Sequence, residues 1–140
     1  MSTYSFPGSS MSAASRGAMA YRTVDAQSRS PLELVVMLYD GGIRFVSEAR
    51  EADGRKDLIA RAVAVSKSLA IVGELRSTLN LEEGAELGLE LDRLYDYMMG
   101  RLLDVTTKRD TSGLEEVQRL LTTLREGWAQ VTASQSPPRS

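Results

Sequence analysis

The sequence carries no proline between Pro31 and Pro137, a stretch that makes up most of the chain. Proline removes a backbone donor and breaks helices, so a long proline-free region with apolar residues three and four positions apart favours α-helices. Few segments alternate apolar and polar residues or concentrate β-branched and aromatic side chains, which leaves strands without an obvious place. The pattern therefore predicts an all-α fold.

Helix start and stop signals divide this region into four helices. Ser30 and Glu33 form a predicted capping box at the first start, and Gly54 ends that helix. Ser112 and Glu115 form a second predicted capping box, at the start of the last helix. The expected helical ranges are 30–54, 57–80, 82–109 and 112–133. Links this short make consecutive helices antiparallel neighbours, so we predict an antiparallel up-down-up-down four-helix bundle.

The two ends of the chain differ in composition from the middle. Residues 1–20 are rich in Ser, Gly, Ala and Met, and the chain ends in SQSPPRS. Segments of this kind bury too little apolar surface to fold alone. We expect a disordered leader over 1–20, the bundle with a short N-terminal cap segment over 21–133, and a disordered tail over 134–140.

The composition removes the chemistry on which most enzymes and metal proteins depend. The chain has no cysteine and no histidine, and its net charge is -2 with acids and bases interspersed. It therefore lacks thiolate and imidazole ligands, the commonest general base, and the basic stripe that nucleic-acid binding requires. No apolar run reaches the roughly 18 residues that a membrane span needs. We expect no enzymatic activity, no cofactor, no metal site, no nucleic-acid binding and no membrane insertion.

Several apolar residues lie off the predicted core seams. The seam of the second helix is Leu58, Ala62, Val65, Leu69, Val72 and Leu79. The seam of the third helix is Leu87, Leu91, Leu94, Met98, Leu102 and Val105. Ile59 and Val63 fall roughly 100–140° away from Leu58 on a helical wheel, and Met99 and Leu103 lie off the third seam. Ordinary packing of two helix flanks is one explanation. The excess taken together favours a second apolar surface, suited to a partner helix.

Two adjacent glycines, Gly41 and Gly42, interrupt the first predicted helix. Each costs about 1 kcal/mol relative to alanine in a helix interior. One explanation is that they let the helix approach a neighbour closely, and the other is that they keep a shallow groove open for a partner. Gly100 in the third helix raises the same two alternatives, which the sequence leaves open.

Three motifs in register resemble the FliS family of bacterial flagellar secretion chaperones, which escort flagellin. The first helix reads SPxEL followed by MLYDGxIR, the third reads LYDYM followed by RL, and the last reads LREGW. Their order and spacing agree with the family from about Tyr21 to Ala133. Each motif is short, but all of them in register form a specific signal.

The resemblance implies a cytoplasmic chaperone with a four-helix bundle and an N-terminal cap. Its expected partners are the disordered C-terminal segment of flagellin and a component of the flagellar export gate. Binding would prevent premature polymerisation of flagellin and deliver it for export. The alternative is a dimeric helical-bundle adaptor with no flagellin client, and a weak homodimer without client is a related expectation.

Wheel position and resemblance together give the residues that we expect to contact the client protein. They are Met37, Leu38, Tyr39, Ile43, Ile59, Val63, Tyr95, Met99 and Leu103. Tyr21 is expected to belong to the cap that competes with the client. Tyr39 and Tyr95 fit either a core or a surface position, since a tyrosine can bury its ring and keep its hydroxyl at the rim.

Overall fold

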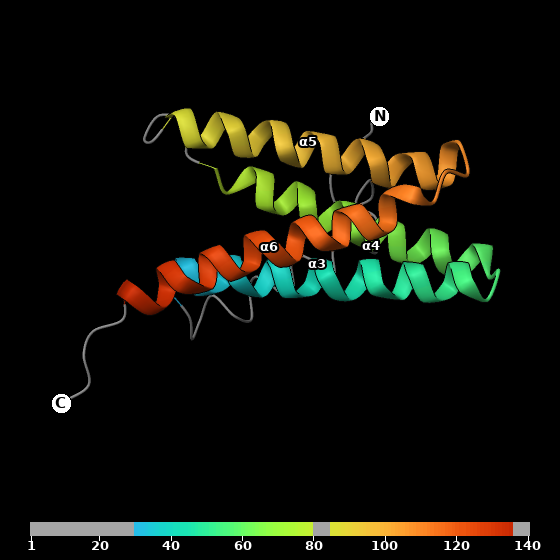
Figure 1. Ribbon diagram of the computed structural model, residues 1–140, viewed down its shortest axis with the longest axis horizontal. Coiled ribbons are helices and arrows are strands. Elements are labelled where there is room, and N and C mark those ends of the chain that lie inside the picture. Colours follow the sequence, from blue (N-terminus) through green and yellow to red (C-terminus); the bar gives the residue numbers. More distant parts are fainter. Residues whose placement is uncertain (1–29, 80–84, 136–140) are drawn as a thin grey trace, which may run out of the picture.

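The computed structural model describes residues 30–79 and 85–135, which form four α-helices lying side by side (Figure 1). The helices are α3 (Pro31–Gly54), α4 (Leu58–Ser77), α5 (Ala85–Thr107) and α6 (Ser112–Gln135). The leader over 1–20, the cap residue Tyr21 and the tail from 136 onward lie outside the described residues. The predicted all-α fold is confirmed.

The helices alternate in direction along the chain and pack around one core (Figure 1). Each helix packs against two neighbours, in the order α3, α4, α5, α6 and back to α3. The three-residue link 55–57 and the four-residue link 108–111 leave no room for a crossover, as the sequence predicted. The N-terminus of α3, the C-terminus of α4, the N-terminus of α5 and the C-terminus of α6 therefore share one end of the bundle, which we call the α3-start end.

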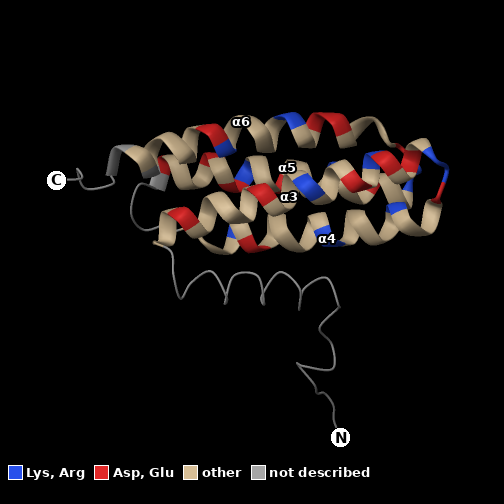
Figure 2. Ribbon diagram, turned by 90° about the horizontal axis from the view of Figure 1, so that it is seen from below, with Lys and Arg blue, Asp and Glu red and all other residues tan. Residues whose placement is uncertain are grey.

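Basic and acidic residues are interspersed along the helices of the bundle (Figure 2). Ion pairs join neighbouring helices, among them Arg76–Asp92 at 2.6 Å, Arg101–Glu116 at 3.0 Å and Arg125–Asp40 at 2.8 Å. Aspartates that the sequence places beside tyrosines are thus bound to arginines. None of the four described helices is both long enough and apolar enough to cross a membrane.

The helix caps follow the sequence at one site and depart from it at another. At α3 the Ser30 hydroxyl accepts the Glu33 N–H (3.2 Å), and the Glu33 carboxylate accepts the Ser30 N–H (3.0 Å), so the first capping box is confirmed. The second one is wrong, because the Ser112 hydroxyl donates to Asp110 Oδ1 at 2.6 Å. The same oxygen accepts the Ser112 N–H at 3.1 Å, so both the hydroxyl and the backbone N–H of Ser112 are bonded to the Asp110 carboxylate.

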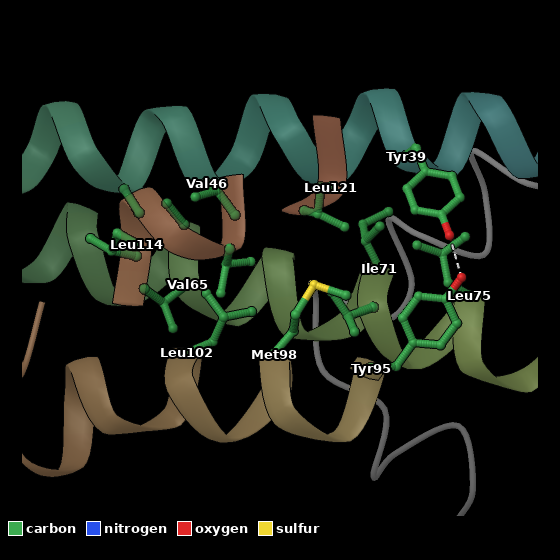
Figure 3. Packing of buried hydrophobic residues seen from close by; sticks show 14 of the residues in the cluster. Tyr39, Val46, Val65, Ile71, Leu75, Tyr95, Met98, Leu102, Leu114 and Leu121 are labelled. Atoms are coloured by element: carbon green, nitrogen blue, oxygen red, sulfur yellow. Dashed lines mark hydrogen bonds between the residues drawn. The ribbon is translucent and has the colours of Figure 1, made fainter. Parts of the chain in front are cut away.

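The core is built from apolar side chains of all four helices (Figure 3). In α4 the buried residues are Arg61, Ala64, Val65, Ser68, Ile71, Val72 and Leu75. Val65 and Val72 of the predicted seam are among them, and Leu69 and Leu79 are partly buried against the core. Leu58 from that seam is 52% exposed. Leu87, which was predicted for the seam of the third helix, lies in the first turn of α5 and is 58% exposed. Ser68 is accommodated in the core because its hydroxyl donates to the Ala64 carbonyl at 2.9 Å. A polar side chain satisfied in this way does not oppose burial.

Gly42 lies where α3 approaches two other helices. A Cβ atom at this position would lie 3.2 Å from Ile71 Cγ2 in α4 and 3.3 Å from Leu121 Cδ1 in α6. Both distances are shorter than ordinary contact, so close packing explains this glycine. A Cβ at Gly100, by contrast, would meet nothing within 4 Å.

We expect Gly42→Val to lower the free energy of unfolding by about 1–3 kcal/mol, since added methyl groups overpack a filled core. Gly100→Ala is the matched control, and it should raise stability by about 0.5–1 kcal/mol through helix propensity. Urea denaturation of both variants measures the difference. A Gly42→Val variant as stable as the parent would show that the three helices separate easily at this point.

Candidate partner-binding surface

The outward side of α4 carries no charged residue along one stripe, which includes exposed apolar side chains. Residues spaced by four and three positions form this side, and they are Ile59, Val63, Ser66, Ala70, Gly73 and Ser77. Ile59 is 80% exposed and Val63 is 49% exposed. Such spacing keeps side chains on one face of a helix and is the spacing of helix–helix seams. The helix thus presents an uncharged stripe to the outside as well as burying one inside.

Apolar residues of α5 adjoin this stripe. A Cβ atom at Gly73 would lie 4.0 Å from Met99 Cε, which places Met99 beside α4. Leu103 follows one turn later on the same side of α5 and is 48% exposed. We call the surface formed by Ile59, Val63, Met99 and Leu103 the α4–α5 face. Those four residues are sequence-predicted contacts that the fold brings onto two adjacent helices.

Three other predicted contacts lie in the core instead. Leu38 and Tyr39 are 0% exposed and Tyr95 is 1% exposed, so the two tyrosines take the core position of the two that the sequence left open, and contact of these three residues with a client stays a prediction. Met37 and Ile43 are half-buried, and Ile43 packs against the core.

The two buried tyrosines meet across the diagonal of the bundle (Figure 3). Their hydroxyl groups are hydrogen-bonded to each other. Trp128 Nε1 of α6 donates a further bond to the Tyr39 hydroxyl at 3.1 Å, so three helices are joined at one point. Burial raises the pKa of Tyr39 and of Tyr95, which keeps both hydroxyls protonated. The sequence analysis missed Trp128 as a polar partner, although a buried indole N–H requires an acceptor.

The remaining exposed aromatic residue on α5 is already engaged by polar partners. Tyr97 is 47% exposed, but its hydroxyl donates to the Glu116 carboxylate at 2.8 Å. Arg101 donates to the same carboxylate at 3.0 Å. The hydrogen bond from Tyr97, which has the larger effect, and the one from Arg101 hold the pKa of Glu116 below its ordinary value. Tyr97 therefore belongs to the α5–α6 contact and not to an open surface.

A hollow of about 330 Å³ borders the α4–α5 face between α3 and α4. Its lining comprises Glu48, Glu51, Ala52, Arg55, Ala60, Val63 and Ala64. Val63 therefore belongs both to this hollow and to the α4–α5 face. Across residues 30–79 and 85–135, no three Asp or Glu side chains gather closely enough to hold a metal ion. The hollow thus combines apolar residues of α4 with the charged Glu48 and Glu51 of α3.

Comparison with known proteins assigns the family. A family model described as "Flagellar protein FliS" matches residues 13–135. The chain belongs to the FliS family. Membership confirms the resemblance found in the sequence and, with it, the prediction that the chain is not an enzyme.

Several curated proteins are similar to this FliS-family chain over most of its length. The flagellar secretion chaperone FliSB of Pseudomonas aeruginosa is 38% identical over 108 residues, covering 76% of this chain and 86% of the relative. The flagellar secretion chaperone FliS of Salmonella typhimurium is 35% identical, covering 86% and 93%. FliS of Bacillus subtilis, with the same description, is 33% identical, covering 86% and 89%.

The Glu116 contacts predict a specific dependence of stability on pH. Unfolding returns the pKa of Glu116 to its higher ordinary value, so the unfolded chain takes up the proton first as pH falls. The stabilisation from this group is therefore present above about pH 4.3 and is lost as pH falls through the folded-state pKa. Glu116→Gln should lower stability at pH 7 and make its decline toward pH 3 less steep, as measured by urea denaturation at several pH values.

Glu115→Gln is the control for this experiment. It removes the same charge one residue earlier and leaves the bonds from Tyr97 and Arg101 to Glu116 in place. Its decline in stability between pH 5 and pH 3 should match that of the parent chain. Equal declines for the Glu116→Gln variant and the parent would contradict a stabilising role of these contacts.

Proposed function

We propose that this chain is a cytoplasmic export chaperone that binds the disordered C-terminal segment of flagellin. Binding holds the segment apart from other flagellin molecules, and docking at the flagellar export gate delivers it for secretion. Family membership and the names of the curated relatives, all flagellar secretion chaperones, support the proposal. The observation that carries it is the α4–α5 face.

The α4–α5 face has the chemistry that a disordered apolar segment needs. Ile59, Val63 and Leu103 are large apolar residues, each about half exposed or more. Contiguous exposed apolar residues on a small soluble bundle mark an interaction site. Met99 adds a flexible, polarisable side chain that adapts to varied partner shapes. A seam spaced by three and four residues suits a partner that becomes helical as it binds.

Mass action is sufficient to explain protection of the client. A chaperone that binds only the monomeric segment lowers the concentration of free segment and therefore opposes polymerisation. Ordering a disordered segment consumes part of the binding free energy, so the complex stays reversible. Reversible binding suits a protein that must release its client for export.

We divide the predicted contacts by their positions in the fold. Ile59, Val63, Met99 and Leu103 are proposed to touch the client directly. Met37 and Ile43 are half-buried and are proposed to contribute at the edge of α3. Leu38, Tyr39 and Tyr95 lie in the core and are proposed to contribute by packing the helices that carry the contact residues.

Coexpression of the full chain with a C-terminal flagellin segment should give a soluble one-to-one complex on a sizing column. The double variant Ile59→Glu/Val63→Glu should weaken binding roughly 30-fold, because about 1 kcal/mol of apolar burial is lost at each site. Circular dichroism should show unchanged helix content, since both side chains point away from the core. Titration of a labelled segment measures the affinity.

Thr122→Glu/Thr123→Glu is the matched control, because it adds the same charge on the exposed side of α6. This variant should bind the segment as the parent does. Loss of helix content in the Ile59/Val63 variant would place those residues in the core and contradict the proposed surface. A dimer that persists when flagellin segment is added would instead favour the adaptor function.

A further inference from the structure

The hollow between α3 and α4 contains two carboxylates that form no ion pair with the described part of the chain. Glu48 and Glu51 line it from α3, three positions apart and therefore as neighbours on one face of the helix. Both side chains are exposed, and so is Arg55, which directly follows α3. Arg55 also lines the hollow but forms no ion pair with either carboxylate. The α3 side of the hollow therefore carries a net negative charge.

Two other carboxylates of α3 are bound to an arginine of a facing helix. Asp40 pairs with Arg125 of α6 at 2.8 Å, and Asp53 pairs with Arg61 of α4 at 2.9 Å. The α4 side of the hollow is instead formed by short uncharged side chains, which are Ala60, Val63 and Ala64. The two carboxylates in the hollow therefore lack the facing cation that these other carboxylates have.

The lysine one turn beyond Val63 on α4 contacts a different group. Lys67 Nζ lies 5.5 Å from the centre of the Phe45 ring, and Arg44 Cζ lies 4.9 Å from the same ring. An aromatic ring attracts cations at such distances. Phe45 thus engages Lys67 one turn before Glu48, and the hollow remains without a cation from α4.

The size and chemistry of the hollow suit the side chain of a lysine or an arginine. Its volume of about 330 Å³ is at the low end of the range for ligand pockets, about 300–1,000 Å³, so it fits one long side chain and not a helix. The methylene groups of lysine and arginine can cover apolar surface while the charged end stays in a polar environment. The alanines and the valine of α4 provide the apolar surface, and the two carboxylates of α3 provide the opposite charge.

We infer that this hollow binds a lysine or arginine side chain of the client segment, with its methylene groups on α4 and its charged end beside Glu48 and Glu51. The inference rests on the proposed function and deepens it, because it gives the client a charge as well as an apolar side. Val63 belongs both to the hollow and to the α4–α5 face. The basic residue of the client therefore lies within about one helical turn of the apolar residue that covers Val63.

Such an ion pair would fix the position of the client along α4. Apolar residues spaced by three and four positions repeat along a helix, so apolar contact alone permits a partner to shift by whole turns. Complementary charges at one place favour a single register and disfavour partners with an acidic residue there. The hollow thus supplies specificity, whereas the α4–α5 face supplies most of the apolar contact.

The test uses the Glu48→Gln/Glu51→Gln variant of the full chain and titration of a flagellin C-terminal peptide. At low ionic strength the variant should bind about fivefold more weakly than the parent, because it loses the ion pair. In about 1 M salt the Debye length falls to about 3 Å, and the difference should disappear. Equal affinity of the parent and the variant at low ionic strength would overturn the inference.

Glu115→Gln/Glu126→Gln is the matched control. It removes two exposed carboxylates from α6, which packs against α3 and α5 and not against α4. The change in net charge is the same, and the affinity should change less than twofold. An equal loss of affinity in both double variants would show a general effect of net charge and contradict a specific site.

A second measurement identifies the basic residue in the peptide. Each lysine and arginine of the peptide is replaced in turn by methionine, which keeps a long side chain and removes the charge. One replacement should weaken binding to the parent chain and have little effect on binding to Glu48→Gln/Glu51→Gln, as expected of an interacting pair. Absence of any such position overturns the inference while leaving the proposed function intact. Failure of the parent chain to bind the unmodified peptide overturns the proposed function itself.

Discussion

Close approach of α3 to α4 and α6 at Gly42 is the constraint on which this bundle depends. The missing side chain lets Ile71 and Leu121 fill the space beside α3 from two sides. Because α3 then packs against both neighbours along its length, α5 closes the bundle opposite it. The long-range hydrogen bond between Tyr39 and Tyr95 spans that diagonal. The surfaces on α4 and α5 are therefore positioned by the packing around a helix that contributes little to them.

Much of the fold follows from local sequence signals. The absence of proline, the capping box at Ser30 and the short links are sufficient for four antiparallel helices. The same wheel analysis correctly placed Ile59 and Val63 outside the core. Local signals of this kind act within a few residues, so they determine where helices begin and which residues can be exposed.

The rest depends on contacts between residues far apart in the sequence. The sequence could not give the rotation of α4, because that helix is apolar on two sides and Leu58 fits either one. It could not separate core from rim at Tyr39 and Tyr95 either, since a tyrosine suits both positions. The structure settles this through the hydroxyl–hydroxyl bond and the indole of Trp128, which joins α6 to α3 across 89 positions of sequence.

Because α4 is otherwise uncharged on both its inner and its outer side, the buried Arg61 has a strong influence on the rotation of this helix about its axis. Because the outer side of such a helix is also uncharged, hydrophobicity constrains its rotation less than in a helix with one apolar and one charged side. Arg61 removes this ambiguity, because its guanidinium reaches Asp53 at 2.9 Å and the Val105 carbonyl at 3.4 Å in one orientation. The two contacts of this polar side chain favour one rotation of α4 about its axis and thereby determine which side of the helix is exposed to solvent.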